Sequence, residues 1–325
     1  MRAAACELDR DGLPDARVHR GLRMVVLRCL AWSWAVLWVG CAASPPPGLP
    51  QDAEGVLRVA SACVETDPAA ARAALETLDE DELTNAELEG YKALYAEALW
   101  RTGKAWKAFR VIRTFPDDHR FSPFAPQVEE VHFRIGAELI QSESTYFLFG
   151  SDRDDGELIL GEFVERYAAS RHADDALRLL GDLAIEEERW FDAQRRFEQL
   201  IQDHPTSEWT SLASFRRVMA IHAELLGPEY DLPSMDRARN ELRDYLATAP
   251  ERPEFRDAAS TAYEQVASWI IERHRIDAEF YRTIGNAYGE RFHLEALVAD
   301  APADHPSAVA AEERLAELGR QGDRP

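Results

Sequence analysis

Residues 170–209 read SRHADDALRLLGDLAIEEERWFDAQRRFEQLIQDHPTSEW, and this stretch decides the fold. Its first half places apolar residues at i, i+3, i+4, i+7 and i+8, a spacing that only an α-helix puts on one face. We expect Ser170 to be the N-cap of this helix and the acidic run 186–188 to end it. The second half repeats the pattern up to Pro205, which cannot continue a helix. The apolar positions are Ala176, Leu179, Leu180, Leu183 and Ala184, then Trp190, Ala193, Phe197, Leu200 and Ile201.

Two such helices cannot bury their apolar faces alone, so the pair is expected to be a helical hairpin that needs neighbours on both sides. Small residues at Gly181 and Ala193 would let the two axes approach closely, with Phe197 filling the space between them. Together with Leu180 and Pro205, these residues have a spacing that resembles the tetratricopeptide repeat. We therefore expect an all-α fold, a right-handed superhelix of tetratricopeptide-like helical hairpins.

Helical spacing continues on both sides of this unit. In the helix predicted at 211–226, the residues expected to face inward include Leu226. Phe280 is one of the apolar residues whose helical spacing predicts one long helix at 255–284. For the last helix we expect Ser307 as N-cap and Gly319 just past the end. The apolar run 146–149 is expected to fold back on the core rather than to form an exposed docking patch. The helices are predicted at 53–78 (two short ones), 87–101, 104–115, 128–140, 158–167, 211–226, 237–246, 255–284, 288–298 and 307–318, with a loop at 116–126.

The N-terminal region contains an apolar run at 29–39, which is shorter than the ~20 residues that a membrane-spanning helix needs. It ends at Gly40-Cys41 and a proline-rich tail, and 37–41 resembles a bacterial lipobox, in which the cysteine is acylated. We expect residues 1–40 to be a signal peptide, with Met24 as an alternative start because the preceding charges are mixed. Residues 41–52 would then be the acylated Cys41 and a proline-rich tether, 53–320 the repeat domain, and 321–325 a disordered tail. The alternative is an uncleaved single-pass anchor at 24–43.

Composition limits the kinds of partner. The 325-residue chain is 46% hydrophobic and 30% charged, which argues against a disordered chain, and its net charge is −22. Nucleic acid is not expected as a partner because phosphate binding needs a basic footprint. The same field disfavours adsorption to an anionic membrane surface. Loss of Cys6 and Cys29 with the signal peptide and acylation of Cys41 would leave only Cys63, which is expected to be a small buried residue. A Cys41–Cys63 disulfide would require that Cys41 not be lipidated.

The order of motifs between 155 and 320 is more specific than the repeat alone. It comprises RYAAS at 166–170, the Leu-Gly hairpin ending in HPTS at 204–207, the enlarged turn GPEYD at 227–231, a long helix reaching EFY at 279–281, and HPSAVAAEERLAELG at 305–319. This order resembles the BamD family, the lipoprotein subunit of the outer-membrane β-barrel assembly machinery. In that family a small-residue helix usually follows the EFY segment, whereas 285–291 is polar here.

The resemblance implies an outer-membrane lipoprotein scaffold, lipid-anchored on the periplasmic face, that helps the assembly and insertion of β-barrel proteins through protein–protein interaction. Its implied partners are the barrel-forming subunit and unfolded outer-membrane protein segments. Two other hypotheses remain open: a periplasmic tetratricopeptide adaptor for envelope or cell-division complexes, and an enzyme whose site is not encoded by a motif.

Catalytic motifs are not found, and we expect no enzymatic activity, no cofactor and no metal. His172 lacks a helical metal-ligand spacing to its acidic neighbours, and His132 and His274 lie alone on predicted helices. The binding hypothesis therefore rests on the surface lined by the first helix of each pair. In the central unit its outward residues form either a partner-binding groove or an ordinary solvated face. These residues are Asp175, Arg178, Asp182 and Glu186.

Overall fold

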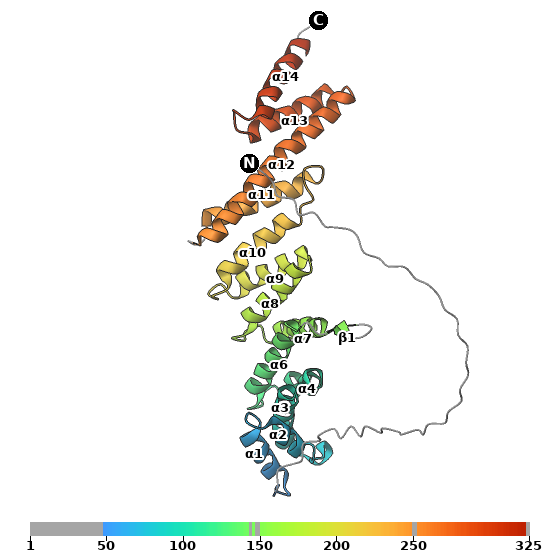
Figure 1. The fold of residues 1–325 in the computed structure, drawn as a ribbon, viewed down its shortest axis with the longest axis vertical. Coiled ribbons are helices and arrows are strands. Elements are labelled where there is room, and N and C mark those ends of the chain that lie inside the picture. Colours follow the sequence, from blue (N-terminus) through green and yellow to red (C-terminus); the bar gives the residue numbers. More distant parts are fainter. Residues whose placement is uncertain (1–47, 143–144, 147–149, 249–251, 323–325) are drawn as a thin grey trace, which may run out of the picture. The chain divides into compact units, whose positions relative to one another are not determined.

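A computed structural model describes residues 48–142, 145–146, 150–248 and 252–322 (Figure 1). They belong to one compact unit, Ala43–Pro325. The predicted signal peptide, Cys41, most of the tether and residues 147–149 lie outside the described residues. The helices are α1 (Ala53–Cys63), α2 (Pro68–Leu75), the 3₁₀-helix η1 (Glu80–Glu82), α3 (Asn85–Arg101), α4 (Ala105–Ile112), α5 (Phe115–Asp118), α6 (Ala125–Ile140), α7 (Asp152–Arg166), α8 (Ala173–Glu186), α9 (Trp190–Asp203), α10 (Thr210–Ala223), α11 (Leu232–Thr248), α12 (Pro253–Thr283), α13 (Ala287–Asp300) and α14 (Pro306–Gly322).

Helices that are neighbours in sequence pack against each other as hairpins along the described chain, and each hairpin also packs on the next (Figure 1). The all-α class and the organisation in helical hairpins are therefore confirmed. The strands of the described residues are two short ones, β1 (Thr145–Tyr146) and β2 (Gly150–Ser151), which pair antiparallel between α6 and α7. The sequence prediction did not anticipate this small hairpin.

The hydrophobic core is a series of local clusters, each shared by adjacent hairpins. One cluster joins α6 and α7 to α8, α9 and α10, and the next joins α10 to α11 and α12. A further cluster packs α12 and α13 against α14. Such a core explains why no single pair of helices in this chain would be stable alone.

The central hairpin has the predicted contact between its two helices. Ala193 and Phe197 of α9 are completely buried, and α9 ends at Asp203, before Pro205. A Cβ atom placed on Gly181 would lie 2.7 Å from Cζ of Phe197. A side chain at position 181 would therefore overlap the aromatic ring, so the glycine is what lets α8 and α9 approach.

Several predicted helix starts were wrong. The helix α8 begins at Ala173 without a side-chain cap, because the Ser170 hydroxyl is used in the preceding turn instead. The helix α7 begins at Asp152 rather than at 158, since Ser151 and Asp154 form a capping box there. The helix α11 begins at Leu232 rather than at 237 and carries Pro233 in its first turn, where a proline is tolerated.

Other local predictions were also wrong. Leu226 lies beyond the end of α10 and is exposed. The helix α14 begins at Pro306 and continues through Gly319, so neither Ser307 nor Gly319 caps it. The loop predicted at 116–126 contains most of the short helix α5.

His132 lies in the core of α6 among the rings of Phe109, Phe163 and Tyr167, with centroid separations of 5.3 to 5.7 Å. It is completely buried, and its Nε2 donates to the carbonyl oxygen of Ile159 at 3.2 Å. Burial disfavours the charged ring and lowers the pKa of His132 to about 4. The side chain is therefore a neutral core residue at physiological pH.

We expect His132 to make the fold sensitive to acid. Because its pKa is lower in the folded chain than the ordinary value of about 6.5, its stabilising contribution is complete above pH ~6.5 and is lost as the pH falls toward about 4. Between pH ~7 and pH ~4.5 this amounts to roughly 2–3 kcal/mol. Urea unfolding at the two pH values measures the loss, and His132→Asn should lose less stability than the unaltered chain. An equal loss in both would show that His132 does not carry the effect.

Candidate functional site

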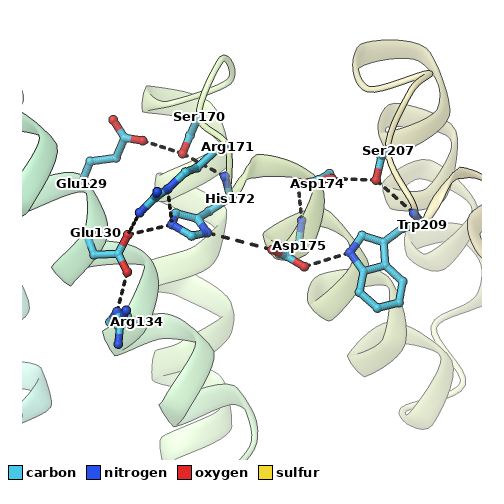
Figure 2. Close-up of polar contacts among 10 residues, drawn as sticks. All are labelled: Glu129, Glu130, Arg134, Ser170, Arg171, His172, Asp174, Asp175, Ser207 and Trp209. Atoms are coloured by element: carbon cyan, nitrogen blue, oxygen red, sulfur yellow. Dashed lines mark hydrogen bonds and ion pairs between the residues drawn. The ribbon is translucent and has the colours of Figure 1, made fainter.

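A polar seam joins the first helices of successive hairpins (Figure 2). In its first half, the hydroxyl of Ser170 donates to Oε1 of Glu129 on α6 at 2.5 Å and accepts from the backbone N–H of His172 at 3.1 Å. The ring Nε2 of His172 lies 2.7 Å from Oε2 of Glu130. The turn before α8 is thereby tied to two adjacent carboxylates of the preceding first helix.

The second half repeats this arrangement one unit later. The hydroxyl of Ser207 donates to Oδ2 of Asp174 at 2.6 Å and accepts from the backbone N–H of Trp209 at 3.1 Å. The indole Nε1 of Trp209 donates to Oδ1 of Asp175 at 2.8 Å (Figure 2). A serine and a ring nitrogen thus meet an acidic pair in both turns, which makes the seam a feature of the repeat.

Glu130 is the carboxylate of the seam that receives the most basic partners. Partial burial raises its pKa, but hydrogen bonds from Arg171, Arg134 and His172 outweigh burial and lower the pKa to about 2. Arg171 lies 2.7 Å from this carboxylate. Glu130 is therefore ionised throughout the physiological range, and its partners fix the junction between α6 and α8.

The predicted groove residues of α8 are engaged by the next hairpin. Asp175 accepts from Trp209, as described above, and the guanidinium of Arg178 lies 4.4 Å from the centroid of the indole ring. Arg178 also pairs with Asp182 at 2.9 Å, and Asp182 pairs with Arg216 of α10. The structure thus brings three of the four predicted residues together, in contacts that hold α8 to α10.

Glu186 lies at the end of α8, apart from the other three residues. Its exposed carboxylate pairs with Arg153 of α7, on the preceding hairpin. The four predicted residues therefore contact neighbouring helices on both sides of α8. Their role in partner binding stays a prediction, because a ligand would have to compete with these intramolecular contacts.

Sequence analysis did not identify Trp209 and Arg216 as the partners of these side chains. A usable signal is present in the sequence. In both turns a serine is followed two positions later by a residue whose ring carries an N–H group: Ser170 and His172 in one turn, Ser207 and Trp209 in the next. The pattern is visible in sequence, but its acidic acceptors lie 33 to 42 residues away and become apparent only in the fold.

A groove forms where α10 passes into α11, and we call it the 226–230 groove. It has a volume of about 300 Å³, and the side chains at its rim include Leu226, 74% exposed, and Tyr230, 56% exposed. Apolar residues Ile221, Leu225 and Met235 also contribute to its lining. An apolar cleft with polar edges is suited to receive an apolar side chain of a partner.

His274 is paired rather than alone. Its Nδ1 lies 3.1 Å from Nδ1 of His293 on α13, and its Nε2 lies 3.7 Å from Asp300. Burial lowers the pKa of both rings, and for His274 the neighbouring ring lowers it further. The pair therefore joins α12 to α13 in a mainly neutral form above the ordinary pKa of histidine.

The described part of the chain has neither a cluster of metal-binding side chains nor a membrane-spanning helix. It contains no group of three or more His, Cys, Asp and Glu residues that could hold a metal ion, and none of its helices is both long and apolar enough to cross a membrane. Cys63 is half-buried at the end of α1 rather than fully buried as predicted. Burial and the nearby Asp67 carboxylate raise the pKa of its thiol.

Comparisons with known proteins found similar solved structures but no matching family. No protein-family model matches the sequence, and no curated protein matches it either. The C-terminal part of a TPR repeat-containing protein from Cytophaga hutchinsonii has a TM-score of 0.37 and 12% identity, over 80% of this chain and 87% of that one. A tetratricopeptide repeat protein from Parabacteroides merdae has a TM-score of 0.36 and 12% identity, over 83% and 99%. The fold assignment rests on the helices described above: the chain is an all-α array of helical hairpins.

Proposed function

We propose that this protein is a membrane-tethered interaction scaffold of the BamD type, which helps assemble β-barrel proteins in the outer membrane. The barrel-forming subunit of the assembly machinery would be its principal partner, and unfolded outer-membrane protein segments would be further ligands. The order of motifs between 155 and 320 and the lipobox-like residues 37–41 support this proposal. An array of hairpins also offers the extended surfaces that scaffolds use.

The observation that carries the proposal is the 226–230 groove. It lies in the enlarged turn that contributes to the resemblance, and Leu226 and Tyr230 stand exposed at its rim. Large apolar side chains are commonly left exposed where a partner covers them. Acidic residues Glu224 and Asp231 and the basic Arg237 border the cleft, which would give a partner polar contacts around an apolar centre.

Substitutions in the groove test whether a partner binds there. Leu226→Asp and Tyr230→Ala should each lower recovery of the barrel-forming subunit about fivefold or more, since truncating an interface anchor costs more than ~1 kcal/mol. Crosslinked affinity purification from membranes measures the recovery. Phe121→Asp is a matched control, because Phe121 is 96% exposed and lies outside the groove. Unchanged recovery in the two groove variants, with a folded chain, would place the binding surface elsewhere.

The tether has its own test. Cys41 is expected to be acylated, so metabolic labelling with a palmitate analogue should mark the protein, and Cys41→Ser should abolish the label. Acylation is also expected to hold the chain on the membrane, since a multiply acylated cysteine binds far more firmly than a single chain. A label that survives in Cys41→Ser would contradict the lipoprotein assignment.

A further inference from the structure

The turn between α12 and α13 carries four large apolar side chains that the fold leaves exposed. We call residues 280–292 the hairpin tip. The exposed fractions are 56% for Phe280, 57% for Ile284, 81% for Tyr288 and 55% for Phe292. Phe280 lies in the last turn of α12 and Ile284 is the C-cap residue of that helix, while Tyr288 and Phe292 both lie in α13. The members of each pair are four residues apart, a spacing that places side chains on the same face of a helix. These four exposed side chains therefore form a set.

Three of these side chains, those of Phe280, Tyr288 and Phe292, also lie on one side of the hairpin. The contact between α12 and α13 runs through Tyr281. Its ring packs on Gly289, where a Cβ atom would lie 2.5 Å from Cδ1 of Tyr281. The ring also stacks on that of His293, with 5.4 Å between the ring centroids. The contact residues are Tyr281, Gly289 and His293. Each of them is preceded directly by an exposed aromatic residue: Phe280, Tyr288 and Phe292. In an antiparallel pair, equivalent positions beside the contact fall on the same side of both helices.

The opposite side of this hairpin is already covered. A pocket of about 340 Å³ lies there, lined by residues of α12, α13 and α14 that include Ala278, Leu294 and Ala311. The four exposed side chains are absent from that lining. They project from the end of a hairpin instead of lining a cavity. A projecting apolar set is better suited to an extended, deformable surface than to a single side chain of a partner.

The hairpin tip carries a net positive charge, although the chain as a whole is acidic. The net charge is −22 overall, yet the charged residues of 280–292 are Arg282, Glu290 and Arg291. Glu290 is buried and accepts from Arg314 at 2.7 Å, so the exposed charges of the tip are both arginines. Arg282 donates to Glu279, whereas Arg291 forms no ion pair among the described residues. Arg291 is thus free to pair with an external anion.

We propose that the hairpin tip contacts a phospholipid bilayer, with the four apolar side chains among the headgroups and Arg291 paired to a lipid phosphate. Aromatic rings favour the boundary between headgroups and acyl chains, and a second membrane contact strengthens a lipid anchor. The acidic remainder of the chain opposes adsorption elsewhere, so the contact is confined to the tip. This inference rests on the proposed membrane location but not on the identity of the protein partner.

Photocrosslinking in the full chain tests the proposal. A photoreactive phenylalanine replaces Tyr288 in one chain and Phe121 in a control, since both positions are highly exposed. Cells are grown with radioactive phosphate, irradiated, and the chain is purified under denaturing conditions. We expect phosphate label at position 288 several-fold above that at position 121, and a lower label when Arg291→Glu is added. Phosphate reports a headgroup-bearing lipid, so acyl groups on Cys41 do not contribute.

Each other result overturns the contact. Crosslinking of position 288 to another polypeptide, or to a second copy of this chain, would make the tip a protein interface. Equal phosphate label at both positions would show that the tip has no special contact with lipid. If palmitate labels Cys41 while position 288 gains no phosphate, the tip inference fails and the membrane tether stands. If both labels are absent, the tip inference and the lipoprotein assignment both fail.

Discussion

Gly156→Ala is expected to destabilise the protein strongly, by about 1–3 kcal/mol or more. A Cβ atom built at Gly156 would lie 2.7 Å from Cα of Ile140 and 2.9 Å from the carbonyl carbon of Leu139. Both are backbone atoms of α6, so no side-chain rotation can relieve the overlap, and α7 would have to move away from α6. Thermal unfolding of the variant measures the effect as a lower melting temperature.

The same helix supplies a matched control for this substitution. Gly161 is also in α7, but a Cβ built there meets no atom within 4 Å. Gly161→Ala should therefore raise stability by about 0.5–1 kcal/mol, because alanine is the better helix former. Opposite signs at the two positions are expected. Loss of stability at Gly161, or none at Gly156, would contradict the packing of α6 against α7.

Gly181→Leu is expected to cost about 1–3 kcal/mol by overpacking the central hairpin. The completely buried ring of Phe197 stands where the new side chain must go, with its Cζ 2.7 Å from the Cβ position. Chemical unfolding measures the loss. The combined change Gly181→Leu with Phe197→Leu should recover part of it, since the smaller side chain makes room and the two sites are in contact. A loss in the double variant equal to the sum of the two single losses would show that residues 181 and 197 do not meet.

The central hairpin was predictable because its signals act at short range. The stripe of apolar residues and the small residues at Gly181 and Ala193 depend on helix geometry alone, and the structure places both small residues in the buried contact. Pro205 likewise stops α9 by a property of its own backbone. Such features need no knowledge of the neighbouring hairpins.

Helix starts were less predictable because capping groups are shared with distant residues. The Ser170 hydroxyl could cap a helix by its position in sequence, but it donates to Glu129, 41 residues earlier. The start of α8 therefore depends on α6. Polar residues of this kind choose between a local backbone partner and a side chain on another helix, and sequence alone does not decide between them.

The candidate site shows the same limit. The outward position of Asp175, Arg178 and Asp182 follows from the helical period, but their engagement by Trp209 and Arg216 depends on how α10 packs on α8. The exposure of Leu226 was also missed, because α10 ends at Ala223 and the chain turns away before reaching it. Leu226, which lines the 226–230 groove, was thus assigned to the core.

The central claim of the proposed function is that the barrel-forming subunit is the principal partner of this chain. Crosslinked affinity purification of the full chain from solubilised membranes tests it most directly. We expect this subunit to be the most enriched protein. If it meets the acidic surface of this chain with a basic patch, association should weaken as salt rises, because exposed pairs are screened beyond about 10 Å at ~0.1 M. Enrichment of cell-division or peptidoglycan proteins in its place would contradict the claim and favour a periplasmic adaptor.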